Sequence, residues 1–180
     1  ASYWDHTIAW YENNGALNPS FTKTTISTLE NGARSVYAAD IDGDGDMDIV
    51  SASSADDTIA WYENDGASNP SFTKTDVSTI ADAAAYVYAA DMDGDGLMDI
   101  AVVSKNKHFY LLDKNGLKVD FDSEKYLLGT PAIGNLDADA DLEVVFSGYS
   151  SGNMVWALNS DGSAVAGFPI ELGEIGRAHV

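Results

Sequence analysis

Short apolar runs alternate with clusters of turn residues along this chain, and the alternation recurs in the same order. Hydrophobic, often β-branched runs occupy residues 49–53, 100–104 and 144–147. A second apolar run follows at residues 58–63, 108–112 and 154–158, and an Asp-Gly or Asn-Gly pair comes after each of them. Such runs, bounded by turn signals, predict short antiparallel strands joined in hairpins. No window shows the period of an amphipathic helix.

The alternation is part of a longer repeat. Residues 7–50 and 58–101 are identical at 31 of 44 positions, at an offset of 51 residues. A third copy is shorter and more diverged, since Asn135 follows Asp91 by 44 residues. Trp156 follows Trp61 by 95 residues, which is the sum of the two repeat lengths, 51 and 44. This spacing predicts that Trp156 keeps the register of Trp10 and Trp61. Periods of about 40 to 50 residues are typical of propeller blades and helical arrays, and the strand pattern favours a β-propeller.

The expected fold class is all-β, a β-propeller segment of four-stranded antiparallel blades. We expect a partial blade over residues 1–32, blades over residues 33–82 and 83–129, and a diverged blade over residues 130–173. About three and a half blades are then present, whereas propellers typically close with roughly 4 to 8. The remaining blades of the same protein, or a second copy of the chain, are therefore expected partners. Residues 174–180 break the pattern and are predicted to be a non-native tail.

An acidic loop in each repeat carries the clearest chemical signal. The loops occupy residues 40–48, 91–99 and 135–143, between the first two expected strands of each blade. Oxygen-bearing side chains stand at loop positions 1, 3, 5 and 9: Asp40, Asp42, Asp44 and Asp48; Asp91, Asp93, Asp95 and Asp99; Asn135, Asp137, Asp139 and Glu143. Carboxylates this close together repel one another unless a cation lies among them. An all-oxygen cage on a glycine-bent loop suits calcium (Ca²⁺).

The three loops are not equivalent. Loop position 7 is occupied by Asp46, Leu97 and Asp141. Because a leucine side chain cannot bind calcium, the side chain at position 7 is not a ligand that all three loops share. The third loop has Ala138 and Ala140 in place of both glycines and a neutral Asn135 at position 1. A glycine eases a left-handed turn that Ala140 adopts only at a cost. Two calcium sites are therefore expected, and the third stays open.

Two other interpretations of the acidic loops fit less well. An EF-hand needs a glutamate at loop position 12, but Ser51, Val102 and Phe146 occupy those positions. The helices that flank an EF-hand loop are not predicted either. A solvated acidic turn is a reasonable interpretation of a single loop, but three copies in one register disfavour it.

The chain resembles the FG-GAP/VCBS repeat family over residues 6–173. The resemblance lies in the acidic loops and in the segments Trp61-Tyr-Glu-Asn-Asp-Gly66 and Trp156-Ala-Leu-Asn-Ser-Asp-Gly162. This repeat builds the propeller of integrin alpha subunits and occurs in many bacterial surface proteins. The resemblance implies calcium in the acidic loops, with the backbone oxygen at position 7 as a further ligand, and a role in adhesion or recognition. It also implies an extracellular or cell-surface location, as in a secreted bacterial protein.

The composition agrees with this expectation and disfavours two classes of partner. The 180 residues include 29 acidic and nine basic ones, which gives a formal net charge of −20, and 13 of the acidic residues lie in the three loops. Because no basic cluster is present, nucleic-acid binding and attachment to an anionic membrane are disfavoured. No stretch reaches the roughly 20 apolar residues of a membrane-spanning helix. The lack of cysteine neither requires nor forbids secretion.

The repeated aromatic residues are expected to pack between blades rather than to bind sugars. These residues are Trp10, Trp61 and Trp156, with Tyr11 and Tyr62 on the opposite strand face. Repetition at one position of the blade favours a structural role, because large aromatic side chains contribute strongly to apolar cores.

The expected activity is binding without catalysis. No serine elbow, phosphate loop or cysteine nucleophile occurs, and His6 and His108 lack the spacing of zinc ligands. No catalytic or cofactor-binding residue is therefore assigned. We expect a glycan or protein ligand at the non-repeated turns, residues 54–57, 105–107 and 149–153, because ligands usually bind to loops on a rigid scaffold. Two alternatives stay open: the propeller part of a secreted polysaccharide lyase or hydrolase, and a purely architectural spacer.

Overall fold

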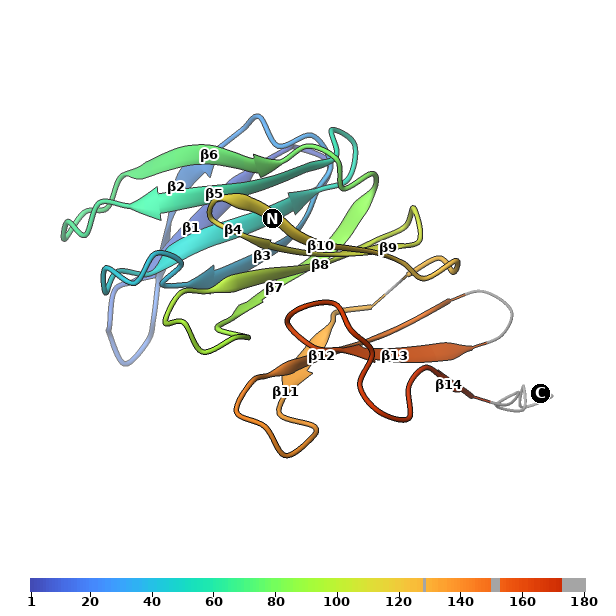
Figure 1. Cartoon of the computed structure of the whole chain (residues 1–180). Helices are drawn as coiled ribbons and strands as arrows, with labels where there is room; N and C mark the ends of the chain where they lie inside the picture. Colours follow the sequence, from blue (N-terminus) through green and yellow to red (C-terminus); the bar gives the residue numbers. More distant parts are fainter. Residues whose placement is uncertain (128, 150–152, 173–180) are drawn as a thin grey trace.

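The structure, a computed structural model, describes residues 1–127, 129–149 and 153–172. Its strands form one two-stranded sheet and three four-stranded antiparallel sheets (Figure 1). The first sheet contains β1 (Ile8–Asn13) and β2 (Phe21–Ser27). The second contains β3 (Ala33–Ala39), β4 (Asp48–Ser53), β5 (Thr58–Asn64) and β6 (Phe72–Ser78). The third contains β7 (Ala84–Ala90), β8 (Asp99–Ser104), β9 (His108–Asp113) and β10 (Gly116–Asp122). The fourth contains β11 (Ala132–Gly134), β12 (Glu143–Ser147), β13 (Met154–Leu158) and β14 (Ile170–Glu171).

Each four-stranded sheet is a meander, because its strands pair in the order of the chain. All regular structure in the described residues is β-strand, and none of it is a helix that could span a membrane. The predicted fold class is confirmed: the chain is an all-β propeller segment with one half-blade and three four-stranded blades. The predicted non-native tail, residues 174–180, lies outside the described residues, as do residues 150–152 of one predicted binding turn.

Inner strands of a blade are buried on both faces, whereas the outer strand is exposed. In β5 every residue from Thr58 to Tyr62 is buried, while β6 is exposed over most of its length. A strand that is covered on both sides needs apolar residues in succession rather than in alternation. The run at residues 59–62 meets this need, and the polar residues 73–76 suit an exposed edge.

Neighbouring sheets pack face to face through apolar clusters. Between the second and third sheets, Val50 and Trp61 pack with Val102 and Leu112. Between the third and fourth sheets the contact is aromatic: Phe109 stacks on Phe146 with 4.7 Å between ring centroids. Aromatic pairs of this kind add roughly 0.5 to 1.5 kcal/mol beyond the area that they bury. The core of the molecule therefore lies between the blades.

Trp156 does not occupy the repeat position of Trp61, so the predicted register was wrong at this residue. Trp61 lies opposite Val50, whereas Trp156 lies opposite Phe146, one residue further from the end of its acidic loop. A shift of one residue turns a side chain to the other face of a sheet. Trp61 therefore faces the following blade and Trp156 faces the preceding one. Both side chains are buried, as predicted for packing residues.

The half-blade leaves one apolar face uncovered. Tyr62 is 1% exposed, because it packs against the two-stranded sheet through Ile8 and its neighbours. Its repeat counterpart Tyr11 is 58% exposed, and Phe21 on β2 is 61% exposed. The prediction that Tyr11 is buried was therefore wrong, because no described sheet packs against its side of the half-blade.

Candidate metal centre

The three acidic loops lie at the same end of their blades. Each joins the first and second strands of a four-stranded sheet, and the sheets share one strand order. Backbone hydrogen bonds connect neighbouring loops. The Met98 N–H donates to the Ile41 carbonyl oxygen at 3.5 Å, and the Leu142 N–H donates to the Met92 carbonyl oxygen at 2.8 Å. In both cases position 8 of one loop contacts position 2 of the preceding loop.

In the first two loops, the carboxylate at position 1 accepts hydrogen bonds from backbone N–H groups of its own loop. In the first loop Asp40 Oδ1 accepts a hydrogen bond from the Gly43 N–H at 2.8 Å, and Oδ2 accepts one from the Gly45 N–H at 3.0 Å. The two glycines have φ angles of 79° and 97°, a region that strongly favours glycine. In the second loop Asp91 Oδ2 accepts from the Gly96 N–H at 3.0 Å. The glycines thus let backbone N–H groups turn inwards to the carboxylate.

The acidic residue at position 9 is buried at the base of each loop. Asp48, Asp99 and Glu143 are 1%, 2% and 0% exposed. One carboxylate oxygen of each accepts a hydrogen bond from the backbone N–H at position 2, which belongs to Ile41, Met92 and Leu136 respectively. Burial raises the pKa of the Asp48 and Asp99 carboxyl groups. A buried carboxylate is costly unless it is hydrogen-bonded or paired with a cation.

Every loop brings three of its predicted acidic ligands together. In each group, one oxygen per residue lies within 4.8 Å of the others. The groups are Asp40, Asp42 and Asp48; Asp91, Asp93 and Asp95; and Asp137, Asp139 and Glu143. Two further predicted carboxylate ligands, Asp44 and Asp99, lie outside these groups. Asp44 Oδ1 instead accepts a hydrogen bond from the Asp46 N–H at 2.9 Å.

In the first two loops the side chain at position 7 contacts residues outside the acidic group. The Asp46 carboxylate lies against Gly66 in the hairpin between β5 and β6. The Leu97 side chain lies near Gly43 of the first loop. Both placements are compatible with a position that contributes only its backbone oxygen.

Within the acidic loops, two buried carboxylate oxygens have no hydrogen-bond partner among the described residues. They are Asp91 Oδ1 in the second loop and Glu143 Oε1 in the third. An unpaired buried oxygen of this kind is costly, and a hard divalent cation would supply the missing interaction. Calcium prefers carboxylate and carbonyl oxygens, which are the donors that these loops present. The residues therefore fit such an ion.

The third loop follows a different backbone path. Ala138 and Ala140 are not among the described residues with a positive φ, whereas the glycines of the first two loops are. Asn135 Nδ2 donates to the backbone oxygens of Asp139 at 2.8 Å and Asp141 at 3.4 Å. A neutral amide thus contacts the carbonyl that is the predicted ligand at position 7. This arrangement is less suited to a metal ion than that of the other two loops.

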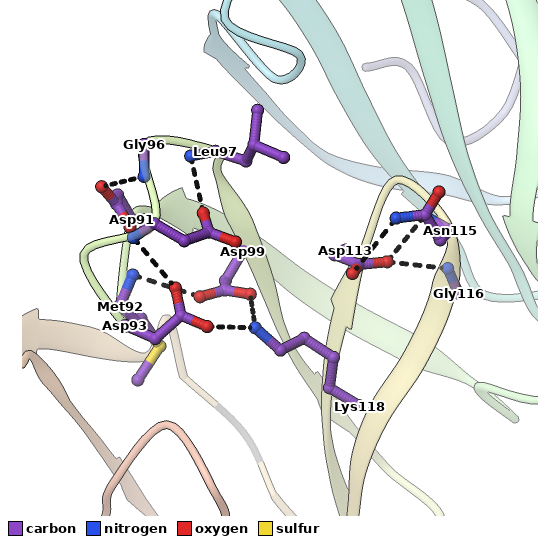
Figure 2. A network of polar contacts seen from close by, with 11 residues as sticks. Asp91, Met92, Asp93, Gly96, Leu97, Asp99, Asp113, Asn115, Gly116 and Lys118 are labelled. Atoms are coloured by element: carbon purple, nitrogen blue, oxygen red, sulfur yellow. Dashed lines mark hydrogen bonds and ion pairs between the residues drawn. The ribbon is translucent and has the colours of Figure 1, made fainter.

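A lysine outside the acidic loops reaches the second one (Figure 2). Lys118 lies on β10, and its Nζ donates to Asp93 Oδ2 at 2.8 Å and to Asp99 Oδ1 at 2.7 Å. Burial by itself would lower the pKa of Lys118, but the hydrogen bonds to the two carboxylates outweigh burial and raise it. The same contact lowers the pKa of Asp93. Sequence reasoning missed Lys118, because it follows Asp99 by 19 residues and no ligand spacing includes it.

Four-stranded meanders stacked face to face, each with an acidic loop after its first strand, define a β-propeller segment whose loops can hold metal ions. The sequence model of the FG-GAP-like repeat family matches residues 1–51 and 40–102. The two matches together cover more than half of the chain, and the chain belongs to this family. No curated protein and no solved structure matches it.

Proposed function

We propose that this chain is a calcium-binding propeller module that recognises a glycan or protein outside the cell and catalyses no reaction itself. One observation carries the calcium part: three loops at equivalent places in three blades each gather three carboxylates within 4.8 Å. Exposed acidic groups often cluster without a metal, but here position 9 is buried in every loop. Membership of the FG-GAP-like family supports calcium as the ion and an extracellular location.

Calcium in the first two loops would stabilise the fold. The side chains at positions 1, 3, 5 and 9 and the backbone oxygen at position 7 would hold it, with water completing the six to eight ligands that calcium takes. At a free calcium concentration ten times the dissociation constant, each site adds about 1.4 kcal/mol, and two sites add about 3 kcal/mol. This is a large share of the roughly 5 to 15 kcal/mol that holds a small domain together.

Melting curves in calcium and in chelator test the calcium part. The midpoint should be higher in calcium. Asp42→Asn should remove the contribution of the first loop, because Asp42 belongs to its acidic group. Asp46→Asn makes the same charge change in the same loop but should retain the contribution, because the Asp46 side chain faces Gly66. Equal midpoints in calcium and chelator would refute calcium binding, and the reverse order of the variants would overturn the ligand assignment.

The opposite end of the blades carries the turns that differ between repeats. Two side chains of the turn at residues 54–57 are part of the scaffold: Asp56 and Asp57 accept hydrogen bonds from the backbone N–H groups of Asn31 and Ala83, at 3.0 Å and 2.9 Å. The turn before β1 is different, because Trp4 stands there at the repeat position of Ala55 and is 88% exposed. This turn was not among the predicted binding turns.

Trp4 belongs to a small group of exposed aromatic and cationic side chains. Its ring meets the Tyr3 ring edge-on, with 5.0 Å between centroids. The Arg34 guanidinium lies 5.4 Å from the centre of the Tyr3 ring. An exposed aromatic ring beside hydrogen-bond donors suits the apolar face and the hydroxyl groups of a sugar. We therefore place glycan recognition at this end of the molecule.

Retention on immobilised polysaccharides, with and without calcium, tests the recognition part. Trp4→Ala should lose retention, whereas Tyr11→Ala, which removes another exposed aromatic ring, should keep it. Retention that is equal for the native protein and Trp4→Ala would move the ligand site elsewhere. A protein that is retained on no glycan or protein surface would be an architectural spacer.

One feature keeps an enzyme as the second candidate. A hollow of about 380 Å³ between the third and fourth sheets is lined by Trp156, by the acidic residues Asp122, Glu124 and Glu171, and by Lys125. Glu124 has a φ of 58°, and strained non-glycine residues are common at functional sites. Shortened or unsaturated sugars released by the native protein would refute the non-catalytic proposal. Glu124→Gln and Glu171→Gln would then show whether the hollow is the active site.

A further inference from the structure

We infer that Lys118 acts as a built-in cation of the second acidic loop and makes this loop bind calcium more weakly than the first. The inference rests on the proposed function, because it concerns the affinity of a proposed calcium site. Figure 2 shows the Lys118 side chain extending from its strand to the loop, where the ammonium group lies between Asp93 and Asp99. These are predicted calcium ligands at positions 3 and 9.

The ammonium group and a calcium ion would use the same oxygens. The distances of 2.8 Å to Asp93 Oδ2 and 2.7 Å to Asp99 Oδ1 are typical of charge-assisted hydrogen bonds. Calcium can bind either oxygen fully only after the ammonium group has moved. A lysine that stays close also repels the ion, because both are positively charged. Both effects lower the affinity of the second loop.

The first loop offers a matched comparison with a neutral donor. Its position 9 residue, Asp48, accepts a hydrogen bond at Oδ1 from the backbone N–H of Asn64, at 2.8 Å. That N–H satisfies one lone pair of the oxygen and brings no net charge into the loop. The equivalent oxygen in the second loop, Asp99 Oδ1, is held by the Lys118 ammonium instead. At position 9 the second loop therefore has a charged donor where the first has a neutral one. The first loop also has Asp46 where the second has Leu97, so the decisive comparison is between variants of the second loop itself.

The set of acidic residues whose oxygens lie close together also differs between the loops. In the first and third loops the residue at position 9 belongs to the group whose oxygens lie within 4.8 Å of one another. In the second loop Asp99 does not belong to the group, and Asp95 takes its place. Asp99 Oδ1, which lies outside the group, is paired with Lys118.

A local irregularity of β10 places Lys118 at the loop. The pairing register of β10 with β9 shifts between Leu117 and Val119, so that Lys118 lies in a bulge. Bulges bend a strand and re-aim the side chain at the extra residue. The preceding hairpin is tight: Asp113 Oδ1 accepts a hydrogen bond from the Gly116 N–H at 3.0 Å, and β10 begins at Gly116 (Figure 2).

The test is a calcium titration of the full chain, monitored by the NMR signals of backbone amides. Each of the two loops has its own glycines, so the loops can be observed separately. Gly43 and Gly45 report on the first loop, and Gly94 and Gly96 report on the second. In the native protein, the first-loop amides should shift at lower calcium concentrations than the second-loop amides. In Lys118→Gln the calcium concentration at the second-loop midpoint should fall about tenfold or more. A hydrogen bond to a charged group changes an equilibrium by about this factor. The first-loop midpoint should stay the same.

Two further variants separate the local contact from a general effect of charge. Lys118→Arg keeps the positive charge and should keep the weaker second loop. Lys114→Gln removes a lysine of the same hairpin that takes part in no ion pair among the described residues, and should change neither midpoint. In chelator, Lys118→Gln should melt at a lower temperature than the native protein, because Asp93 and Asp99 lose their counter-charge.

The outcomes distinguish this inference from the calcium proposal on which it rests. An unchanged or higher second-loop midpoint in Lys118→Gln overturns the inference, while a response of the first loop leaves the calcium proposal standing. Equal effects of Lys114→Gln and Lys118→Gln show a general charge effect and also overturn it. If no glycine of either loop responds to calcium in any variant, the calcium proposal fails, and the inference fails with it.

Discussion

Removal of a lysine that pairs with a buried glutamate should weaken the junction between the half-blade and the second sheet. Glu30 follows β2 and is 0% exposed. Its Oε1 accepts hydrogen bonds from Lys74 Nζ and Ser27 Oγ, each at 2.9 Å. Its Oε2 has no hydrogen-bond partner in the described part of the chain. Burial and, after it, the Glu30 carboxylate raise the pKa of Tyr62, so the tyrosine stays neutral beside the glutamate.

The perturbation is Lys74→Met, which keeps an unbranched side chain but removes the charge. Loss of one partner of a buried ion pair costs about 3 to 5 kcal/mol, because the other charge stays buried without compensation. Since the Lys74 side chain is 32% exposed, water compensates in part, and we expect the lower end, about 3 kcal/mol. A loss of this size is a large share of the stability of a small domain.

Urea unfolding at a fixed calcium concentration measures this loss. Glu30→Gln in the Lys74→Met background should recover much of the stability, because a neutral amide is less costly to bury than an unpaired carboxylate. Ser27 and Tyr62 remain available to an amide at this position. Two results would refute the reasoning: a loss below about 1 kcal/mol, which is typical of an exposed ion pair, or a double variant no more stable than Lys74→Met.

Two further predictions concern the surface of the blades. Gly66→Ala should cost more than Gly15→Ala, by less than about 1 kcal/mol. The φ angles are 67° and 68°, but only the methyl group added at Gly66 meets the Asp46 carboxylate, which must move aside. Urea unfolding checks the difference, and equal costs would contradict the placement of Asp46. The chain should also self-associate through the face that exposes Tyr11 and Phe21, because an uncovered apolar sheet face favours association. Light scattering over a dilution series checks this, and a monomer at every concentration would contradict it.

Local signals made the blades predictable from the sequence. Strands bounded by Asp-Gly or Asn-Gly turns and an acidic loop in each repeat are encoded within a few residues, and the structure has the strands and sheets that they predict. The register of Trp156 was not predictable from spacing, because the shorter third repeat matched the expected distance while the residue shifted to the other sheet face. The exposure of Tyr11 depends on which neighbour covers the half-blade, and the repeat pattern does not contain that information.

Lys118 shows a different limit of sequence reasoning about the site. The ligands of a loop follow one another at fixed spacings, so a motif finds them. The contact of Lys118 depends on a strand bulge and on the length of the preceding hairpin. Neither changes the loop motif, which is nearly the same in the first and second loops. The inferred difference in calcium affinity between the two loops would therefore come from a neighbouring strand, and a comparison of the loop sequences alone does not find this contact.

The hydrogen bonds between neighbouring acidic loops bear on how copies of the repeat can change after duplication. Donor and acceptor are both backbone groups, at positions 8 and 2 of successive loops, so substitution of their side chains does not remove the bond. The third loop lacks both glycines and has Asn135 in place of the aspartate at position 1, yet the Leu142 N–H donates to the Met92 oxygen at 2.8 Å. A blade can thus carry substitutions in its acidic loop and still dock on its neighbour. Under the calcium proposal, the array can hold blades that serve as scaffold alone beside blades that bind metal.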